Sequence, residues 1–240
     1  MASWVQDILL WFFPVIISVS WHEVSHAYVA NLRGDKTAKD SGRLKWNPFY
    51  HLDGVGSILI PLTMILLNSG IVYGWGRPLP INVNILKKPI IDRALVAISG
   101  LGMTILLAFA FTLLGKLGEY ANHAQINQLG FIITEIANNG VNINIVIFMV
   151  NLIPIPPLDT GRLVESFMNK RQRYFISFVE PFALIFVVAL LFLSNTKNQI
   201  VPAHQYLTKL VSHTTDYTID GVKYRSNRLW QKSLKGLGLQ

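Results

Sequence analysis

The chain has 240 residues and a formal net charge of +8; 51% of its residues are hydrophobic and only 14% are charged. Its mean hydropathy of +0.39 is too high for an ordinary soluble domain, so the composition predicts a protein embedded in a lipid bilayer. The absence of cysteine excludes disulfides and cysteine-ligated metals, and the basic residues cluster between apolar segments without interleaved aromatics, which argues against nucleic-acid binding.

Four apolar stretches are long enough to cross a bilayer, which takes about 20 helical residues. They cover residues 8–30, 94–115, 139–158 and 177–194. The first resembles a signal peptide, but it follows Asp7 without any Lys or Arg and lacks a small-residue cleavage site, so we expect a retained span. The first and third stretches are interrupted by polar residues, which are costly in lipid and therefore indicate where function lies.

Two further segments lie between the first two spans. Residues 54–69 are apolar but short and contain Pro61, so they predict a short span or a re-entrant hairpin. Residues 72–82 are rich in Gly and Pro and predict a loop or an irregular β-like segment. Such a segment can offer an exposed edge to an extended peptide, although a plain connecting loop is the alternative.

The first span contains the sequence HEVSH at residues 22–26. Residues four apart lie on one face of a helix, so His22 and His26 can offer imidazole nitrogens to one Zn²⁺. Glu23 then lies beside the metal, where it can take a proton from water as a general base. The alternative is that these residues only form hydrogen bonds to neighbouring helices.

A catalytic zinc site needs a third protein ligand. Asp159 is the leading candidate because Pro154, Pro156 and Pro157 break the third span just before it and can turn its carboxylate into the helix bundle. Asp53 is the alternative ligand. His51, close to Asp53 in the sequence, is more typical of a structural histidine.

The composition becomes polar after residue 195. We therefore expect a membrane domain at residues 1–195 and a small polar C-terminal tail at 196–240. Within the tail, residues 217–225 alternate apolar and polar side chains around an Asp-Gly pair, which predicts a possible hairpin.

Four segments of the sequence resemble the site-2 protease family of intramembrane zinc metalloproteases, and more narrowly its compact bacterial members without a PDZ domain. They are HEVSHAYVA at 22–30, residues 33–61, GWGRPLPIN at 74–82 and NLIPIPPLDTGR at 151–162. The resemblance implies one Zn²⁺ per chain held by His22, His26 and Asp159, with Glu23 as catalytic base. It also implies that Asn151 contacts the substrate, although an interhelical amide is an equal alternative.

The resemblance further implies the substrate class and the location of the protein. The expected partners are membrane-spanning protein substrates, cut in or near their transmembrane helices, and the lipid bilayer; the expected location is the bacterial inner membrane, crossed several times. The expected fold is an all-α polytopic bundle of about four to six transmembrane helices with the re-entrant or irregular segment described above. The sequence contains no signal for an oligomeric state.

Two positions depart from the family pattern. Thr160 stands where the family has Gly after the ligand Asp, and residues 98–104 (ISGLGMT) lack the Pro of the family motif and its final Asn, leaving Thr104. Ser99 and Gly100 keep the small residues that allow close packing. The departures leave two alternatives open: a catalytically inactive relative, and a membrane protein that binds or transports metal with the same ligands.

Overall fold

The computed structural model describes residues 3–67, 69, 71–82, 85–86, 88–123, 127–192 and 194–215. The described chain is helical and contains no β-strand, as expected for the all-α class. Its longer helices are α1 (Ser3–Leu32), α4 (Pro89–His123), α5 (Asn127–Asn151), α7 (Lys170–Phe192) and α8 (Ser194–Thr215). The shorter ones are α2 (Thr37–Asp40), the 3₁₀ turn Pro48–Tyr50, the π-helix Gly54–Leu59, α3 (Ile60–Leu66) and α6 (Asp159–Glu165).

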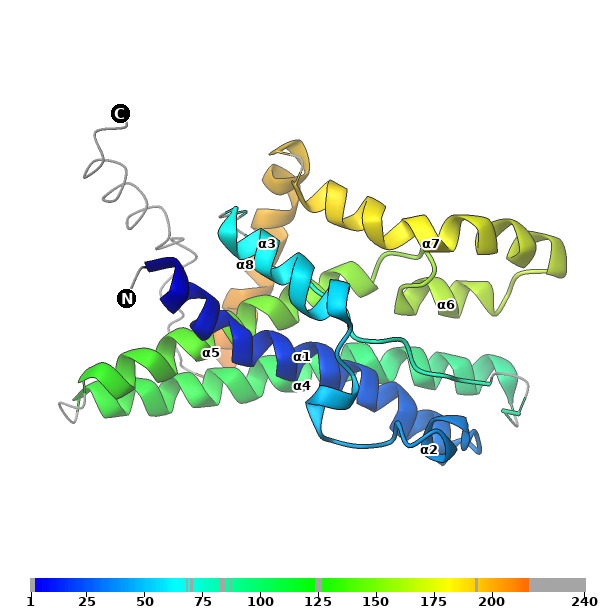
Figure 1. The fold of residues 1–240 in the computed structure, drawn as a ribbon, viewed down its shortest axis with the longest axis horizontal. Coiled ribbons are helices and arrows are strands. Elements are labelled where there is room, and N and C mark those ends of the chain that lie inside the picture. The colour runs from blue at the N-terminus through cyan, green and yellow to red at the C-terminus, as the bar shows by residue number, and fades with distance from the viewer. Residues whose placement is uncertain are drawn as a thin grey trace.

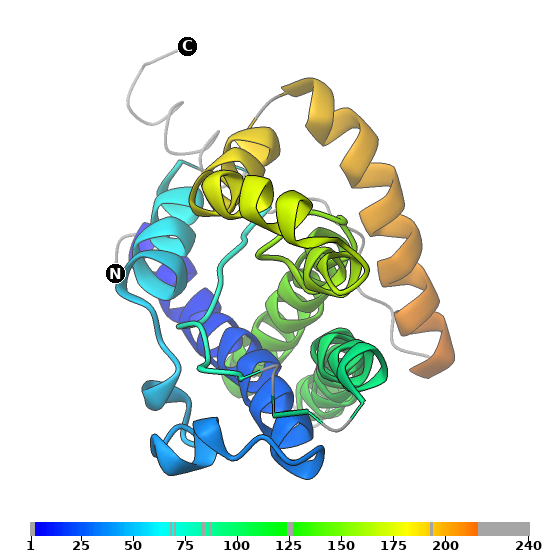
Figure 2. The same cartoon turned by 90° about the vertical axis from the view of Figure 1, so that its right-hand side faces the viewer.

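Helices α1, α4 and α5 form the centre of the molecule (Figure 1). Each packs against the other two, and among the described residues these three helices are long and apolar enough to cross a membrane. The chain is therefore a membrane protein, with leucines and phenylalanines exposed along its helices as lipid-facing surface. Figure 2 shows α7 and α8 on the outside of this group, with α8 against α4 and α5.

The third apolar stretch does not have the limits that its hydropathy suggests. Its helix, α5, begins at Asn127 and ends at Asn151, whereas the sequence places this span at 139–158. Prolines lack the amide hydrogen that a helix needs, so the helix stops before Pro154. Polar residues in the helix are accommodated by burial: Asn144 donates to Ser18 Oγ of α1 at 2.7 Å and is completely buried.

Residues 54–66 form a short apolar helix, the π-helix followed by α3. Thirteen helical residues extend about 20 Å, which is less than the roughly 30 Å hydrocarbon core of a bilayer. This segment is therefore too short to cross a bilayer as a regular helix. Its re-entrant arrangement stays a prediction.

Residues 71–82 are extended and pair with the chain around residues 51–57. Trp75 N donates to Gly56 O at 3.2 Å, Ser57 Oγ donates to Trp75 O at 2.8 Å, and Arg77 N donates to His51 O at 2.7 Å. The pairing is close because Gly74 has no side chain: a Cβ there would lie 2.6 Å from Gly56 O. This extended segment forms one wall of the pocket described below.

The first part of the polar tail is helical, since α8 covers residues 194–215 and packs on α4 and α5. The hairpin expected at 217–225 lies outside the described residues. The division of the chain at residue 195 stays a prediction.

Candidate metal centre

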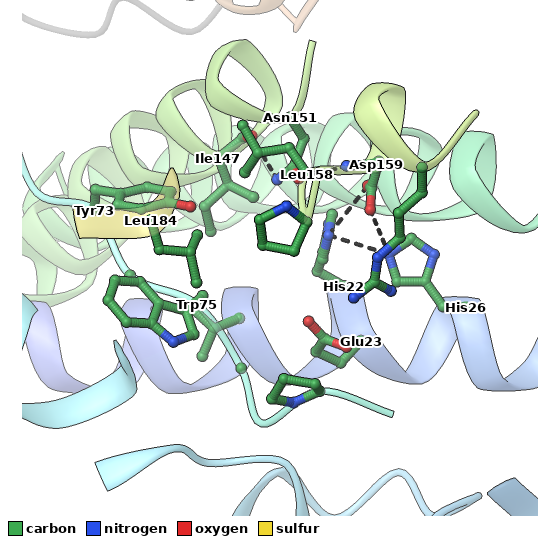
Figure 3. Close-up of a pocket in the computed structure, with 16 residues that line it drawn as sticks. His22, Glu23, His26, Tyr73, Trp75, Ile147, Asn151, Leu158, Asp159 and Leu184 are labelled. Atoms are coloured by element: carbon green, nitrogen blue, oxygen red, sulfur yellow. Dashed lines mark hydrogen bonds and ion pairs between the residues drawn. The ribbon is translucent and has the colours of Figure 1, made fainter. Parts of the chain in front are cut away.

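His22 and His26 lie one turn apart on α1 and face the same pocket (Figure 3). Both are buried, and their Nε2 atoms are 3.2 Å apart with the rings perpendicular. Their Nδ1 atoms point the other way, to α4: His22 Nδ1 donates to Gly100 O at 3.1 Å and His26 Nδ1 donates to Val96 O at 2.7 Å. Because a carbonyl only accepts, each Nδ1 carries the proton and each Nε2 presents a lone pair.

Helix α4 provides a matched register for the two imidazoles. Val96 and Gly100 are themselves four residues apart, so two carbonyls on successive turns of α4 hold two histidines on successive turns of α1. The helices approach closely at this point because residue 100 is glycine: a Cβ there would lie 2.3 Å from His26 Cε1.

Asp159 reaches the same point from a different part of the chain. It begins α6, after the irregular residues 152–158 that follow α5. Its Oδ2 is 3.3 Å from His22 Nε2 and its Oδ1 is 3.1 Å from His26 Nε2. Asn151 supports this position, because its Oδ1 accepts a hydrogen bond from Asp159 N at 3.2 Å while its Nδ2 donates to Ile147 O.

The three side chains fit a zinc ion. Zinc–ligand distances of about 2.0–2.1 Å in a tetrahedron place neighbouring ligand atoms about 3.3 Å apart. The two Nε2 atoms, with facing lone pairs, are 3.2 Å apart, and each lies within 3.3 Å of one of the two Asp159 carboxylate oxygens. Asp159 Oδ2 is buried without a hydrogen bond. A cation at the centre satisfies all three groups.

Electrostatics at Asp159 point in the same direction. Burial alone would raise the pKa of its carboxyl group, but the electrostatic attraction and hydrogen bonding of the neighbouring His26 and His22 outweigh burial and hold the pKa well below its ordinary value. Positive charge at this position therefore stabilises the carboxylate, and bound Zn²⁺ would have the same effect.

Glu23 is next to the ligand group but is not part of it. Its carboxylate points into the pocket beneath His22 (Figure 3). The opposite wall is close, since a Cβ on Gly76 would lie 2.5 Å from Glu23 Cγ. The carboxylate therefore lies beside the three candidate metal ligands, where the sequence places a general base.

One curated protein is similar over most of the chain. "Putative zinc metalloprotease YwhC" of Bacillus subtilis (strain 168) is 36% identical over 177 residues, which cover 73% of this chain and 77% of the relative. The chain belongs to this zinc metalloprotease family. No family profile matches the sequence, and no solved structure matches it.

The other candidate ligands lie outside the group formed by His22, His26 and Asp159. The Asp53 carboxylate caps the π-helix, accepting from Val55 N at 3.0 Å and from Gly56 N at 2.7 Å. His51 is completely buried and donates from Nε2 to Lys45 O at 2.8 Å. Both have structural positions around residues 45–57.

The two departures from the family pattern have different surroundings. Thr160 is only half-buried, so its side chain has room, whereas Gly161 packs against the backbone: a Cβ there would lie 2.1 Å from Ile155 C. Thr104 is completely buried and donates to Leu101 O within α4 at 2.8 Å. The glycine that this metalloprotease needs for the Asp159 turn is therefore Gly161.

Sequence reasoning missed Val96 and Gly100 as orienting groups. Their carbonyl oxygens act through backbone, so no side-chain motif identifies them. The only sequence signal was the pair of small residues Ser99 and Gly100, which indicates close helix packing but does not identify the helix that packs there.

Proposed function

We propose that the chain is an intramembrane zinc endopeptidase of the site-2 protease type, which hydrolyses peptide bonds in or near transmembrane helices of membrane-bound substrates. One observation carries the proposal. The group formed by His22, His26 and Asp159, with Glu23 beside it, is built on α1, a helix apolar enough to cross a membrane, and is buried against two more such helices. Ionisable residues in such a place are costly unless they serve function.

In the proposed mechanism, His22, His26 and Asp159 hold one Zn²⁺, which when bound supplies a Lewis acid for the substrate carbonyl and for water. Glu23 takes a proton from the attacking water and delivers it to the leaving amine. The α4 carbonyls fix the two imidazoles so that only Nε2 faces the centre. Asn151 lines the pocket and accepts a hydrogen bond from Asp159 N. Its contact with substrate stays a prediction.

A helical substrate must unwind before it is cut, because its carbonyls are occupied by hydrogen bonds within the helix. The extended segment at residues 71–82 is a candidate binding site for the unwound peptide. The backbone amides of Trp75 and Arg77 donate hydrogen bonds to residues 51–57. Backbone groups alternate in direction along an extended chain, so those of the residues between them point the other way. Gly74 and Gly76 line the pocket, so their backbone is available for pairing with a peptide there.

The location proposed is the bacterial inner membrane, crossed several times, where regulated intramembrane proteolysis takes place. The expected partners are membrane-spanning protein substrates and the surrounding lipid. These proposals rest on the three apolar helices and on the resemblance to the site-2 protease family.

The test is to reconstitute the purified protein in proteoliposomes, measure zinc per chain, and follow cleavage of a transmembrane reporter by mass spectrometry. One zinc per chain with cleavage that a chelator abolishes is the expected result. Bound zinc without cleavage would instead identify an inactive relative. Zinc movement across the vesicle membrane without cleavage would identify a transporter.

A further inference from the structure

A tyrosine hydroxyl lies unused at the end of the pocket away from the metal ligands. Tyr73 is only 1% exposed, and its ring packs in the core cluster with Val19, Ile147 and Leu158. Within the part of the chain that the structure describes, its hydroxyl makes no hydrogen bond. The hydroxyl is not one of the fully buried polar atoms that lack a partner, so it keeps a small accessible surface through which a ligand can reach it.

The hydroxyl points into the pocket. Figure 3 shows the Tyr73 oxygen directed toward the space between Ile147 and Leu184, with Glu23 and the metal ligands further along the same pocket. The pocket has a volume of about 60 Å³. A group entering it from the substrate therefore reaches both the metal ligands and the tyrosine.

Three donors near the metal-ligand end of the pocket are already engaged. The Nδ1 atoms of His22 and His26 donate to α4, and Asn151 Nδ2 donates to Ile147 O. The Trp75 indole nitrogen packs on Gly56, where a Cβ would lie 2.3 Å from it. At the apolar end of the pocket, the Tyr73 hydroxyl is a donor that makes no hydrogen bond to the described residues.

We propose that Tyr73 is a substrate-binding residue, whose hydroxyl donates a hydrogen bond to a backbone carbonyl of the unwound substrate segment. The inference rests on the proposed proteolytic function. Unwinding frees substrate carbonyls from their helical partners, and in an apolar pocket each needs a new donor.

The hydroxyl keeps its proton for this purpose. Burial, followed by the negative charges of Asp159 and Glu23, raises the pKa of Tyr73 above its ordinary value. Tyr73 therefore acts as a neutral donor over the whole physiological pH range, and its contribution should not titrate.

The test compares wild type with Tyr73→Phe, and with Tyr120→Phe as a matched control on the 76% exposed Tyr120 of α4. In proteoliposomes, Tyr73→Phe should lower kcat/KM for a transmembrane reporter about tenfold. It should keep one zinc per chain. Its unfolding temperature should match that of wild type, because the hydroxyl makes no hydrogen bond to the described residues. Tyr120→Phe should change none of these quantities.

A structural role would give the opposite pattern. If Tyr73→Phe lowers the unfolding temperature along with kcat/KM, or leaves kcat/KM unchanged, the inference is overturned. To separate it from the proposed function, reporter binding is measured as Kd in a Glu23→Gln background with and without Tyr73→Phe. If the reporter binds but the wild-type protein does not cleave it, only the proposed proteolytic function is overturned. The role of Tyr73 is then decided by the ratio of the Kd values with and without Tyr73→Phe, which we expect to be about tenfold. Absence of both cleavage and binding overturns both proposals.

Discussion

The pocket has two walls of different construction. One is helical and consists of His22 and His26 on α1, Val96 and Gly100 on α4, and Asp159 on α6; the other is the extended segment 71–78. In the helical wall, each histidine Nδ1 is bonded to a carbonyl of α4, so the α4 backbone holds the orientation of the Nε2 atoms. In the extended wall, the backbone bonds lead away from the pocket to residues 51–57.

This difference separates two tasks. A metal site needs ligand atoms held within a few tenths of an ångström, and packed helices provide that rigidity. A site for an unwound peptide needs free backbone groups and donors, which an extended glycine-containing segment provides. Changes to the helical wall should therefore affect zinc binding, and changes to the extended wall should affect turnover with zinc retained.

The largest effect is expected at Asp159. Asp159→Ala removes one of the three protein ligands that a stable catalytic zinc site requires, so the purified variant should lose its bound zinc and all activity. Asp53→Ala is the control, because its carboxylate caps the π-helix instead. Zinc per chain is measured by elemental analysis; full zinc occupancy in Asp159→Ala with loss in Asp53→Ala would show that the third ligand is wrong.

Glu23→Gln should separate catalysis from metal binding. The amide cannot accept a proton from water, so turnover should fall by about 10²- to 10⁴-fold while one zinc per chain remains. Glu119→Gln, at the far end of α4, is the matched control and should behave as wild type. Turnover at the wild-type rate in Glu23→Gln would show that Glu23 is not the general base.

The parts of the site that were predictable from the sequence are those encoded locally. The spacing of His22 and His26 is a property of one helix, and the chemistry of zinc then calls for a carboxylate, for which the proline-broken exit at residues 151–162 supplied Asp159. The structure brings these three residues together. Their roles stay predictions until the variants above are measured.

The rest depends on how distant segments pack. The register that places two α4 carbonyls opposite two α1 histidines is set by tertiary contacts, and backbone oxygens have no sequence signature. The same is true of Tyr73, whose sequence position gives no sign of a buried hydroxyl. The limits of α5 were also missed, since hydropathy averages over the asparagines of its first half and does not register the early stop imposed by Pro154.

Gly100→Ala tests the helical wall directly. The new Cβ would meet His26 Cε1 at 2.3 Å and Asp159 Oδ2 at 2.7 Å, both parts of the fixed ligand set. We expect zinc affinity to fall about 10- to 100-fold, the usual effect of disturbing the groups that orient metal ligands. Gly102→Ala is the control two residues along α4, where a Cβ has no neighbour within 4 Å. Equal affinities in a competition titration with a zinc chelator would contradict the close approach of α4.

Gly76→Ala makes the corresponding change on the extended wall. Its Cβ would lie 2.5 Å from Glu23 Cγ, so the base or the extended segment has to shift. Turnover should fall about tenfold, a moderate cost of misplacing a catalytic group, with zinc affinity unchanged. Gly54→Ala has nothing within 4 Å and serves as control. Loss of zinc in Gly76→Ala would break the division of tasks between the two walls.

The smallest effect is expected at Thr160. Its side chain is only half-buried, and the position with the close approach to Ile155 is the next residue, Gly161. Thr160→Gly should therefore leave zinc affinity and kcat/KM within about twofold of wild type, and should change the free energy of unfolding by about 0.5 kcal/mol or less, since Thr and Gly differ little in helix propensity. Gly161→Ala, measured in parallel, should lower zinc affinity, because its Cβ would force α6 and Asp159 away from residues 155–156. A gain of tenfold or more in kcat/KM for Thr160→Gly would show that Thr160 impairs a family activity, and would favour the alternative of a weakened or inactive relative.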